Sequence, residues 1–338
     1  MKLHSALARV KEGGSLSRSE ARAVVAGSLV EGSDAALLAE LLRALAARGE
    51  TPAEIAGGAD ALREAMIPFP HDHENAIDTC GTGGDGRQTF NLSTAAAIVA
   101  AAAGAVVIKH GNRSQSSRCG SADLLEAAGI PLDLPGARSR RILDEIGITF
   151  LFAPAHHPAL RHAAPVRKAI GSRTIFNFLG PLANPGSVRR QLVGVPEERR
   201  VREIAATLAE LGHERGYVVH GAGGADELTL AGANIVEPIG SAPRGRFDGD
   251  PLGLVRAEVE ALRGGNAAEN LRILRTVLDG EFSAHLDAVI LNTAAALVVA
   301  GIAEDAEDGA RRAGEAIASG RARGKLSRWV ELSRERGA

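Results

Sequence analysis

Residues 76–111 constrain the fold more than any other part of the sequence. They comprise an apolar run at 76–80, a glycine-rich loop at 81–88, an alanine-rich run at 93–103 with Gly104 as its C-cap, and a second apolar run at 105–111. A strand, a loop, a helix and a second strand in this order are the building block of a parallel sheet. Apolar and helical stretches continue to alternate at 147–152, 191–195, 199–211 and 216–220. The sequence therefore predicts an α/β fold with a mostly parallel central sheet flanked by helices.

The first seventy residues predict helices instead. Ser17 and Glu20 have the spacing of a capping box, and Pro52 follows Thr51 at the first position of another helix. Residues 33–47 carry apolar side chains at helical spacing. No strand signal interrupts these stretches, so we expect residues 1–70 to form a small all-helical N-terminal domain.

The chain of 338 residues is long enough for two domains, on a prior of about 150 residues per domain. Prolines interrupt the strand and helix alternation between His157 and Pro185. We expect residues 157–188 to complete the helical domain. Residues 71–156 and 189–338 would then form a larger α/β domain, which returns to helices at 267–278 and 285–299.

Charge and composition restrict the class of partner. The sequence has 39 basic and 41 acidic residues, with one Trp and one Tyr, so neither a basic surface nor aromatic stacking favours a nucleic-acid partner. The longest apolar run, residues 95–108, is too short for a membrane span and contains Gly104. Two distant cysteines, Cys80 and Cys119, suggest no disulfide framework. We expect a cytoplasmic protein that binds small polar ligands.

The glycine-rich loop 81–88 formally matches the G-x-G-x-x-G pattern of dinucleotide-binding folds. The next predicted strand ends in Lys109 and His110, where an acidic ribose ligand would be expected, so only a variant for NADP would fit. No Gly-Lys-Ser/Thr follows, which excludes a P-loop. Glycine amides before a helix N-terminus, with Asn91, Ser93 and Thr94 beside them, predict a site for phosphate or pyrophosphate. The alternative is a structural turn in which Asn91 or Ser93 is only an N-cap.

Two further loops extend this chemistry. Residues 109–118 supply Lys109, Arg113 and several serines after the second predicted strand. Because ligands of parallel sheets bind beyond the carboxyl ends of strands, we expect this loop to hold phosphate next to the glycine loop. Asp226 and Glu227 follow the predicted strand at 216–220, and such carboxylates are typical Mg²⁺ ligands when phosphate is present. The alternative is that this acidic pair only begins a helix or turn.

Other reactive side chains fit metal binding or nucleophilic catalysis less well. His71, His73 and Glu74 lie in a proline-flanked linker, and His156, His157 and His162 have no acidic neighbour, so zinc is disfavoured. Cys119 lies among serines without a legible cysteine, histidine and asparagine pattern, and a small buried filler is the better interpretation.

Four long motifs, at 78–97, 109–129, 166–186 and 220–230, together resemble the anthranilate phosphoribosyltransferase family, and the likeness extends over nearly the whole chain. The resemblance implies transfer of the phosphoribosyl group of 5-phosphoribosyl 1-pyrophosphate (PRPP) to the amine of anthranilate in tryptophan biosynthesis. It further implies two Mg²⁺ ions per subunit and a homodimer formed through the helical domains. Cys80, Gln115 and His156 depart mildly from the family pattern.

The resemblance also implies site residues. The PRPP positions are Gly81, Gly84, Asp85, Thr89, Asn91, Leu92, Ser93, Thr94, Lys109, His110, Gly111, Asn112, Arg113, Ser114, Gln115, Ser116, Ser117 and Ser121. The metal positions are Ser93, Asp226 and Glu227. Gly81, Asn112 and Arg167 match anthranilate contacts, with His110 and Pro181 lining the same tunnel. No residue is implied as a certain catalytic group, since Asn112, Arg167 and His110 would act by positioning.

Three other functions remain as alternatives. A pyrimidine nucleoside phosphorylase would share the architecture but should not need the Asp226 and Glu227 pair. A nucleic-acid-binding relative of the fold should show a basic surface, and an NADP dehydrogenase rests on the partial glycine pattern alone. For the dimer, Leu37, Leu38, Leu41, Leu42 and Leu45 are the expected interface, with core packing inside one chain as the alternative.

Overall fold

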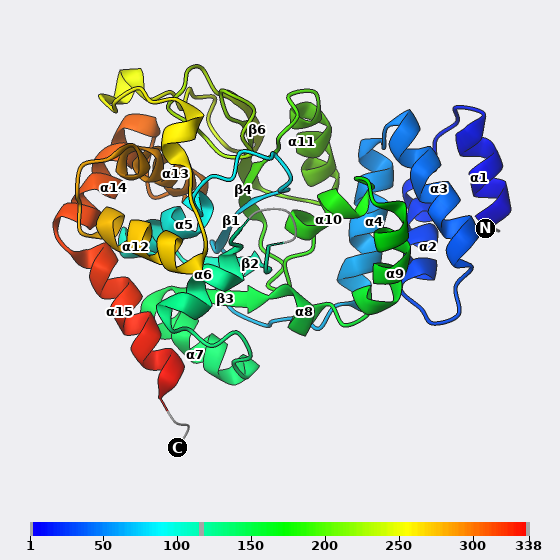
Figure 1. Ribbon diagram of the computed structural model, residues 1–338, viewed down its shortest axis with the longest axis horizontal. Coiled ribbons are helices and arrows are strands. Elements are labelled where there is room, and N and C mark those ends of the chain that lie inside the picture. The colour runs from blue at the N-terminus through cyan, green and yellow to red at the C-terminus, as the bar shows by residue number, and fades with distance from the viewer. Residues whose placement is uncertain (1–2, 115–117, 336–338) are drawn as a thin grey trace.

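The computed structural model describes residues 3–114 and 118–335. Within them a six-stranded sheet has the order β3-β2-β1-β4-β5-β6, and every neighbouring pair is parallel except β5 and β6 (Figure 1). The strands are β1 (Ile77–Gly81), β2 (Val107–Gly111), β3 (Ile148–Phe152), β4 (Arg190–Gly194), β5 (Arg215–His220) and β6 (Ile235–Gly240). The prediction of a mostly parallel sheet is confirmed.

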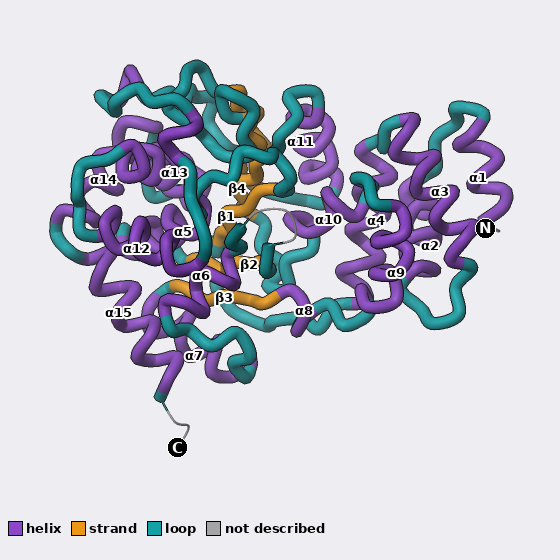
Figure 2. The backbone as a smooth tube through the Cα atoms, in the orientation of Figure 1, coloured by secondary structure: helices purple, strands orange, loops and turns teal. Residues whose placement is uncertain are grey.

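Helices lie on both sides of the strands (Figure 2). One end of the molecule consists of α1 (Leu3–Lys11), α2 (Arg18–Ser28), α3 (Ala35–Arg48), α4 (Pro52–Ala65), α9 (Leu160–Ile170) and α10 (Phe176–Leu182). The sheet is accompanied by α5 (Leu92–Ala102), α6 (Ser121–Ala128), α7 (Gly136–Ile146), α8 (Ala153–His156), α11 (Arg200–Glu210), α12 (Ala267–Leu278), α13 (Ala284–Ala300), α14 (Ala306–Ala318) and α15 (Arg321–Arg334). Two short 3₁₀ turns lie at Asp250–Leu252 and Val259–Leu262.

The sheet buries both of its faces. Leu192 and Tyr217 point into a core shared with α5 and α13, whereas their neighbours Val193 and Val218 point into a second core shared with the helical end and α11. Successive residues of a strand face opposite sides, so this alternation is what a sheet covered on both faces requires.

The N-terminal helices begin where local sequence signals place them. Ser17 accepts a hydrogen bond from the Glu20 amide while the Glu20 carboxylate accepts from the Ser17 amide, and Thr51 with Glu54 repeats the arrangement. Helix α3 begins at Ala35 with Asp34 as its N-cap, two residues after the start of the predicted stretch at residue 33. Helices α9 and α10 pack against α3 and α4 respectively, although about one hundred residues separate them in the chain.

The leucines expected to form a dimer interface are instead core residues of one chain. Leu38, Leu41, Leu42 and Leu45 are at most 2% exposed, and Leu37 is partly buried against the same core. The interpretation of this run as an uncovered face was therefore wrong, because α1, α2 and α9 already cover it.

Two local features differ from expectation. Strand β6 was not predicted, since its only strand-like signal is a short apolar run broken by Pro238, and it lies antiparallel at the sheet edge where proline is tolerated. The C-cap of α5 is Ala103, and Gly104 follows it with a φ of +105°, a conformation that glycine adopts without strain.

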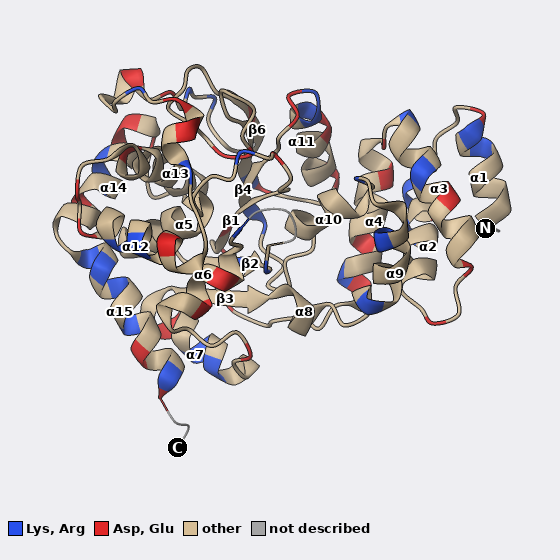
Figure 3. Ribbon diagram, viewed as in Figure 1, with Lys and Arg blue, Asp and Glu red and all other residues tan. Residues whose placement is uncertain are grey.

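Basic and acidic residues are interspersed over the elements in the view of Figure 3, in keeping with the formal net charge of −2. Among the helices of residues 3–114 and 118–335, none has the length and apolar composition needed to cross a bilayer.

Candidate active site

A cleft of about 810 Å³ opens at the carboxyl ends of β1 and β2 and extends to α9 and α10. This volume lies in the range of small-molecule sites. Most of the residues proposed from sequence line it, namely Gly81, Gly84, Asp85, Thr89, Asn91, Ser93, Thr94, Lys109, His110, Gly111, Asn112, Arg113, Ser114, Ser121, Arg167, Pro181, Asp226 and Glu227. Leu92 points into the core with no exposed surface. Gln115, Ser116 and Ser117 lie outside the described residues.

Asp226 lies close to the glycine loop because glycines on two neighbouring strands leave room for it. Its Oδ2 accepts a hydrogen bond of 2.6 Å from the Gly83 amide. Gly81 and Gly194 are register partners on β1 and β4, and a Cβ atom would lie 2.2 Å from Asp226 Oδ2 at Gly81 and 1.6 Å from the Asp226 carbonyl oxygen at Gly194. Glycine is therefore required at position 194, where the clash is with backbone, whereas a side chain at position 81 would displace the Asp226 carboxylate. Gly194 was missed in the sequence, where it reads as an ordinary strand residue.

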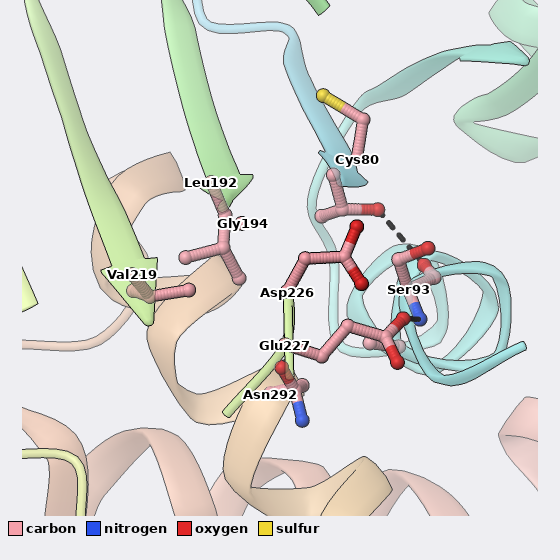
Figure 4. Close-up of a pocket in the computed structure, with 10 residues that line it drawn as sticks. Cys80, Ser93, Leu192, Gly194, Val219, Asp226, Glu227 and Asn292 are labelled. Carbon is pink, nitrogen blue, oxygen red and sulfur yellow. Dashed lines mark hydrogen bonds between the residues drawn. The ribbon is translucent and has the colours of Figure 1, made fainter. Parts of the chain in front are cut away.

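The Glu227 carboxylate accepts a backbone hydrogen bond at the N-terminus of α5. Its Oε1 accepts a 2.9 Å bond from the Ser93 amide, and its Oε2 accepts a 3.3 Å bond from the Thr89 hydroxyl. Figure 4 shows the carboxylates of Asp226 and Glu227 beside Ser93. Asn91 occupies the N-cap position but makes no capping bond, so the interpretation of Asn91 as a simple cap was wrong.

The buried carboxyl groups of Asp226, Glu227 and Asp85 repel one another electrostatically. Burial and then the charge of Asp85 raise the pKa of Asp226, and burial and then the charge of Asp226 raise the pKa of Glu227. Asp85 Oδ2 is buried and meets no hydrogen-bond donor at bonding geometry among the described residues. The protein alone therefore leaves these acidic groups poorly compensated, which favours a cation between them.

Two of the cationic side chains in the cleft are already engaged by the protein. Lys109 is 2% exposed and donates to the Thr79 carbonyl oxygen at 2.5 Å, and burial lowers the pKa of its ammonium group. Arg113 donates to Asp123 and Glu126 at 2.8–2.9 Å and lies over the ring of Phe152. Neither presents the free charge that the loop sequence suggests.

Arg167, in the last turn of α9, is different. No ion pair or hydrogen bond of its guanidinium is found within residues 3–114 and 118–335, and its Cζ lies 5.3 Å from the centre of the Phe176 ring. Burial lowers the pKa of Arg167, because the cation has lost water without gaining an anion. Its guanidinium is therefore available to bind an anionic ligand group in the cleft.

His110 packs against a second histidine. Its Nδ1 lies 3.2 Å from the Gly180 carbonyl oxygen, an acceptor, so this nitrogen carries the proton. Burial, followed by the charge of His157, lowers the pKa of His110 to about 3, and the two rings are 5.1 Å apart. His110 is therefore neutral at physiological pH, and its buried Nε2 has no hydrogen-bond partner in the part of the chain that the structure describes.

Arg173 connects the helical end to the glycine loop. Its Nη1 donates to the Gly83 carbonyl oxygen at 2.7 Å, and its Cζ lies 5.7 Å from the centre of the Phe178 ring. Gly84 adopts a φ of +78°, and a Cβ atom there would lie 2.2 Å from Arg173 Nη1. Gly83 is thus held by Asp226 at its amide and by Arg173 at its carbonyl.

The remaining candidates are not arranged as reactive sites. In the described part of the chain, no group of three or more His, Cys, Asp or Glu side chains is placed to hold a metal ion. Cys80 and Cys119 form no disulfide with one another, and burial raises the pKa of the Cys119 thiol to about 11. A protonated thiol is a poor nucleophile.

Comparison with known families matches the two parts of the chain separately. Residues 4–66 match the helical bundle domain of the glycosyl transferase family, and residues 73–323 match the a/b domain of that family. The anthranilate phosphoribosyltransferase of Myxococcus xanthus is 46% identical over 98% of this chain and 99% of its own length.

Solved structures give the same result. The crystal structure of anthranilate phosphoribosyltransferase from Thermus thermophilus is 43% identical, with a TM-score of 0.92 over 98% of this chain and 99% of that one. The Saccharomyces cerevisiae enzyme in complex with PRPP and Mg is 26% identical, with a TM-score of 0.89 over 98% and 97%. In complex with 4-fluoroanthranilate, the yeast enzyme has a TM-score of 0.86 at the same identity, over 98% of both chains.

Proposed function

The chain belongs to the anthranilate phosphoribosyltransferase family, glycosyltransferases of tryptophan biosynthesis, and we propose that its cleft is where it transfers the phosphoribosyl group of PRPP to the amine of anthranilate. Pyrophosphate is the leaving group. The observation that carries this assignment is the meeting of three features in one cleft: a glycine loop at a helix N-terminus, the Asp226 and Glu227 pair, and the unpaired cation of Arg167. The glycine loop suits the phosphate groups of PRPP, the acidic pair suits Mg²⁺ bound to its pyrophosphate, and Arg167 suits the carboxylate of anthranilate.

The phosphate groups of PRPP would lie along the two loops at the ends of β1 and β2. The amides of Gly84 and Gly86 and the hydroxyl group of Ser93 would supply donors there. The carboxylate of anthranilate would pair with Arg167, and Asn112, His110 and Pro181 would enclose its ring. The yeast relative that contains PRPP and the one that contains 4-fluoroanthranilate support this choice of substrates.

The residues around Asp226 fit Mg²⁺. Two oxygen-donor carboxylates that repel one another, together with the unpartnered Asp85 Oδ2, suit a hard cation that completes its coordination with phosphate oxygens and water. Bound Mg²⁺ would neutralise charge that develops on the pyrophosphate. We propose that Asp226, Glu227 and Ser93 hold two such ions per subunit, and the Mg in the yeast complex supports the choice of metal.

The protein's own contribution is positioning. The attacking aromatic amine is uncharged near neutral pH, so it needs alignment with the ribose C1 more than it needs a base. Arg167 and Asn112 would orient the amine. Neutral His110 would form part of the wall, since a group with a pKa of about 3 is a weak base. The transfer would then pass through a loose, oxocarbenium-like transition state.

The wider organisation is proposed on similar grounds. Residues 1–70 with about 157–188 would form the helical domain and residues 71–156 with 189–338 the α/β domain, a division supported by the packing of α9 on α3 and of α10 on α4. We propose a cytoplasmic homodimer joined through the helical domains. The exposed Val30, at the turn after α2, is an apolar residue that such contact could cover, and sedimentation at micromolar concentration tests the dimer.

Calorimetry tests the assignment. PRPP should bind the chain in the presence of Mg²⁺ and much more weakly when Mg²⁺ is chelated. Inorganic phosphate and NADP serve as competing ligands, since a phosphorylase would favour the first and a dehydrogenase the second. Binding of PRPP that is indifferent to Mg²⁺, or a preference for either competitor, would contradict the proposal.

A further inference from the structure

Asn91 holds the N-cap position of α5, yet its side chain bonds away from the helix. Glu227 takes the Ser93 amide, which leaves the Asn91 amide group for other partners. Asn91 Nδ2 donates to the Cys119 carbonyl oxygen at 3.1 Å, and Asn91 Oδ1 accepts from Asn270 Nδ2 at 2.7 Å. Asn91 also lines the cleft. A distant residue therefore determines how a residue of the cleft presents its amide.

Asn270 can face Asn91 in only one way. It lies in the first turn of α12, is 1% exposed, and its Oδ1 accepts a 2.6 Å bond from the Gly265 amide. Because a backbone amide can only donate, the Asn270 oxygen must face Gly265 and its NH₂ group must face Asn91. The orientation of one amide thus fixes the other.

The segment before α12 is packed closely against the segment before α5. The Phe90 amide donates to the Leu262 carbonyl oxygen at 2.8 Å, and the Gly264 amide donates to the Gln88 carbonyl oxygen at 2.9 Å. A Cβ atom at Gly264 would lie 2.6 Å from Asn270 Oδ1 and 2.9 Å from Phe90 Cα. Gly264 therefore allows the close approach on which the contact between Asn270 and Asn91 depends.

We propose that Asn270 is a positioning residue for PRPP, acting through Asn91. With Oδ1 bonded to Asn270 and one N–H bonded to Cys119, Asn91 retains one N–H to offer to a ligand. A donor suits the oxygens of a diphosphate or ribose, whereas the flipped amide would present a carbonyl oxygen and repel them. The inference rests on the proposed function, in which Asn91 contacts PRPP.

A double-mutant cycle tests this coupling, with the dissociation constant of PRPP in Mg²⁺ measured by calorimetry. Asn270→Ala should weaken PRPP binding about 2- to 10-fold, the usual value of one hydrogen bond. In an Asn91→Ala background the same change should have no further effect, because the residue through which it acts is gone. The dissociation constant of anthranilate should stay constant throughout.

Asn266→Ala is the matched control, since Asn266 caps α12 without touching Asn91. It should lower the melting temperature and leave the affinity for PRPP unchanged. If Asn270→Ala does not fold, Asn270→Asp carries the cycle, because it keeps the volume and the acceptor for Gly265 while removing the donor to Asn91.

The outcomes distinguish the proposed contact of Asn91 with PRPP from the positioning role of Asn270. If Asn91→Ala leaves PRPP affinity unchanged, the proposed contact of Asn91 with PRPP fails, and this inference fails with it. If Asn91→Ala weakens binding but the Asn270 change weakens it by the same factor in both backgrounds, the positioning role alone is overturned. An equal loss in Asn266→Ala would likewise reduce Asn270 to a support of α12.

Discussion

At the scale of single residues, the cleft contains charges that the protein has already paired and charges that it has not. Arg113 is held by Asp123 and Glu126, and Lys109 is buried against a carbonyl oxygen. Arg167 has neither kind of partner among the described residues. Since a buried charge is costly unless it is paired, an unpaired cation in a cleft indicates where an anionic ligand group binds.

Replacement of Arg167 tests this interpretation. A charge-assisted hydrogen bond contributes about 1.5–3 kcal/mol, so Arg167→Ala should weaken anthranilate binding about 10- to 150-fold and leave PRPP binding nearly unchanged. Arg161→Ala, on the exposed side of the same helix, is the control and should change neither. Calorimetry with each substrate measures both. Equal losses for the two substrates would show that Arg167 acts only through its packing on Phe176.

His110 gives a second test at this scale. Because burial and His157 lower its pKa to about 3, His110 does not change charge between pH 6.5 and 8.5. His110→Asn should therefore keep kcat within about tenfold of wild type and leave the pH profile unaltered over this range, since loss of a general base costs about 10²–10⁴-fold. A drop of about 10³-fold in kcat together with loss of the acidic limb of the profile would establish His110 as the base.

At the scale of elements, local signals were readable in the sequence and contacts across the fold were not. The capping boxes at Ser17 and Thr51 lie within four residues each and could be predicted. Strand β6 could not, because an edge strand with a proline depends on its partner β5. Most of the cleft residues could be predicted because they lie in conspicuous sequence motifs. Gly194 and Asn270 could not, because they contact Asp226 and Asn91 from more than thirty positions away in the sequence.

Close helix packing gives an element-scale prediction. In α4, a Cβ atom at Gly57 would lie 2.1 Å from the Arg18 carbonyl oxygen of α2. Gly57→Ala should therefore lower the free energy of unfolding by about 1–3 kcal/mol. In α2, Gly27 has no atom within 4 Å of such a Cβ, so Gly27→Ala should raise it by about 0.5–1 kcal/mol. Urea unfolding of both variants checks the pair, and a loss of stability in both would contradict the packing argument.

At the scale of the whole molecule, the fold gathers four separated segments into one cleft. The glycine loop, the loop after β2, the end of α9 and the turn holding Asp226 lie far apart in the sequence. Two cores on opposite faces of the sheet hold these segments in place. The helical end contacts the α/β part through α4 and α11, and His213, three residues after the end of α11, is 7% exposed.

His213 makes the stability of the molecule sensitive to acid. Burial, followed by the charge of Arg63, lowers the pKa of His213 from 6.5 to about 4, so the unfolded chain takes up a proton first as the pH falls. Stability from this residue is therefore lost as the pH falls below 6.5. Between pH 7 and pH 5 the wild type should lose about 2 kcal/mol more than His213→Gln. Equal losses in urea unfolding of the two proteins would contradict the assignment.

The most direct measurement of the central claim is product formation at limiting Mg²⁺. With PRPP and anthranilate, the wild type should form N-(5-phosphoribosyl)anthranilate and pyrophosphate in equal amounts, as followed by mass spectrometry. Turnover should saturate with Mg²⁺ and stop when it is chelated. Asp226→Asn and Glu227→Gln should fold, since each keeps its volume and an acceptor oxygen, yet lose most turnover at limiting Mg²⁺. Full activity of both variants under these conditions would contradict the account.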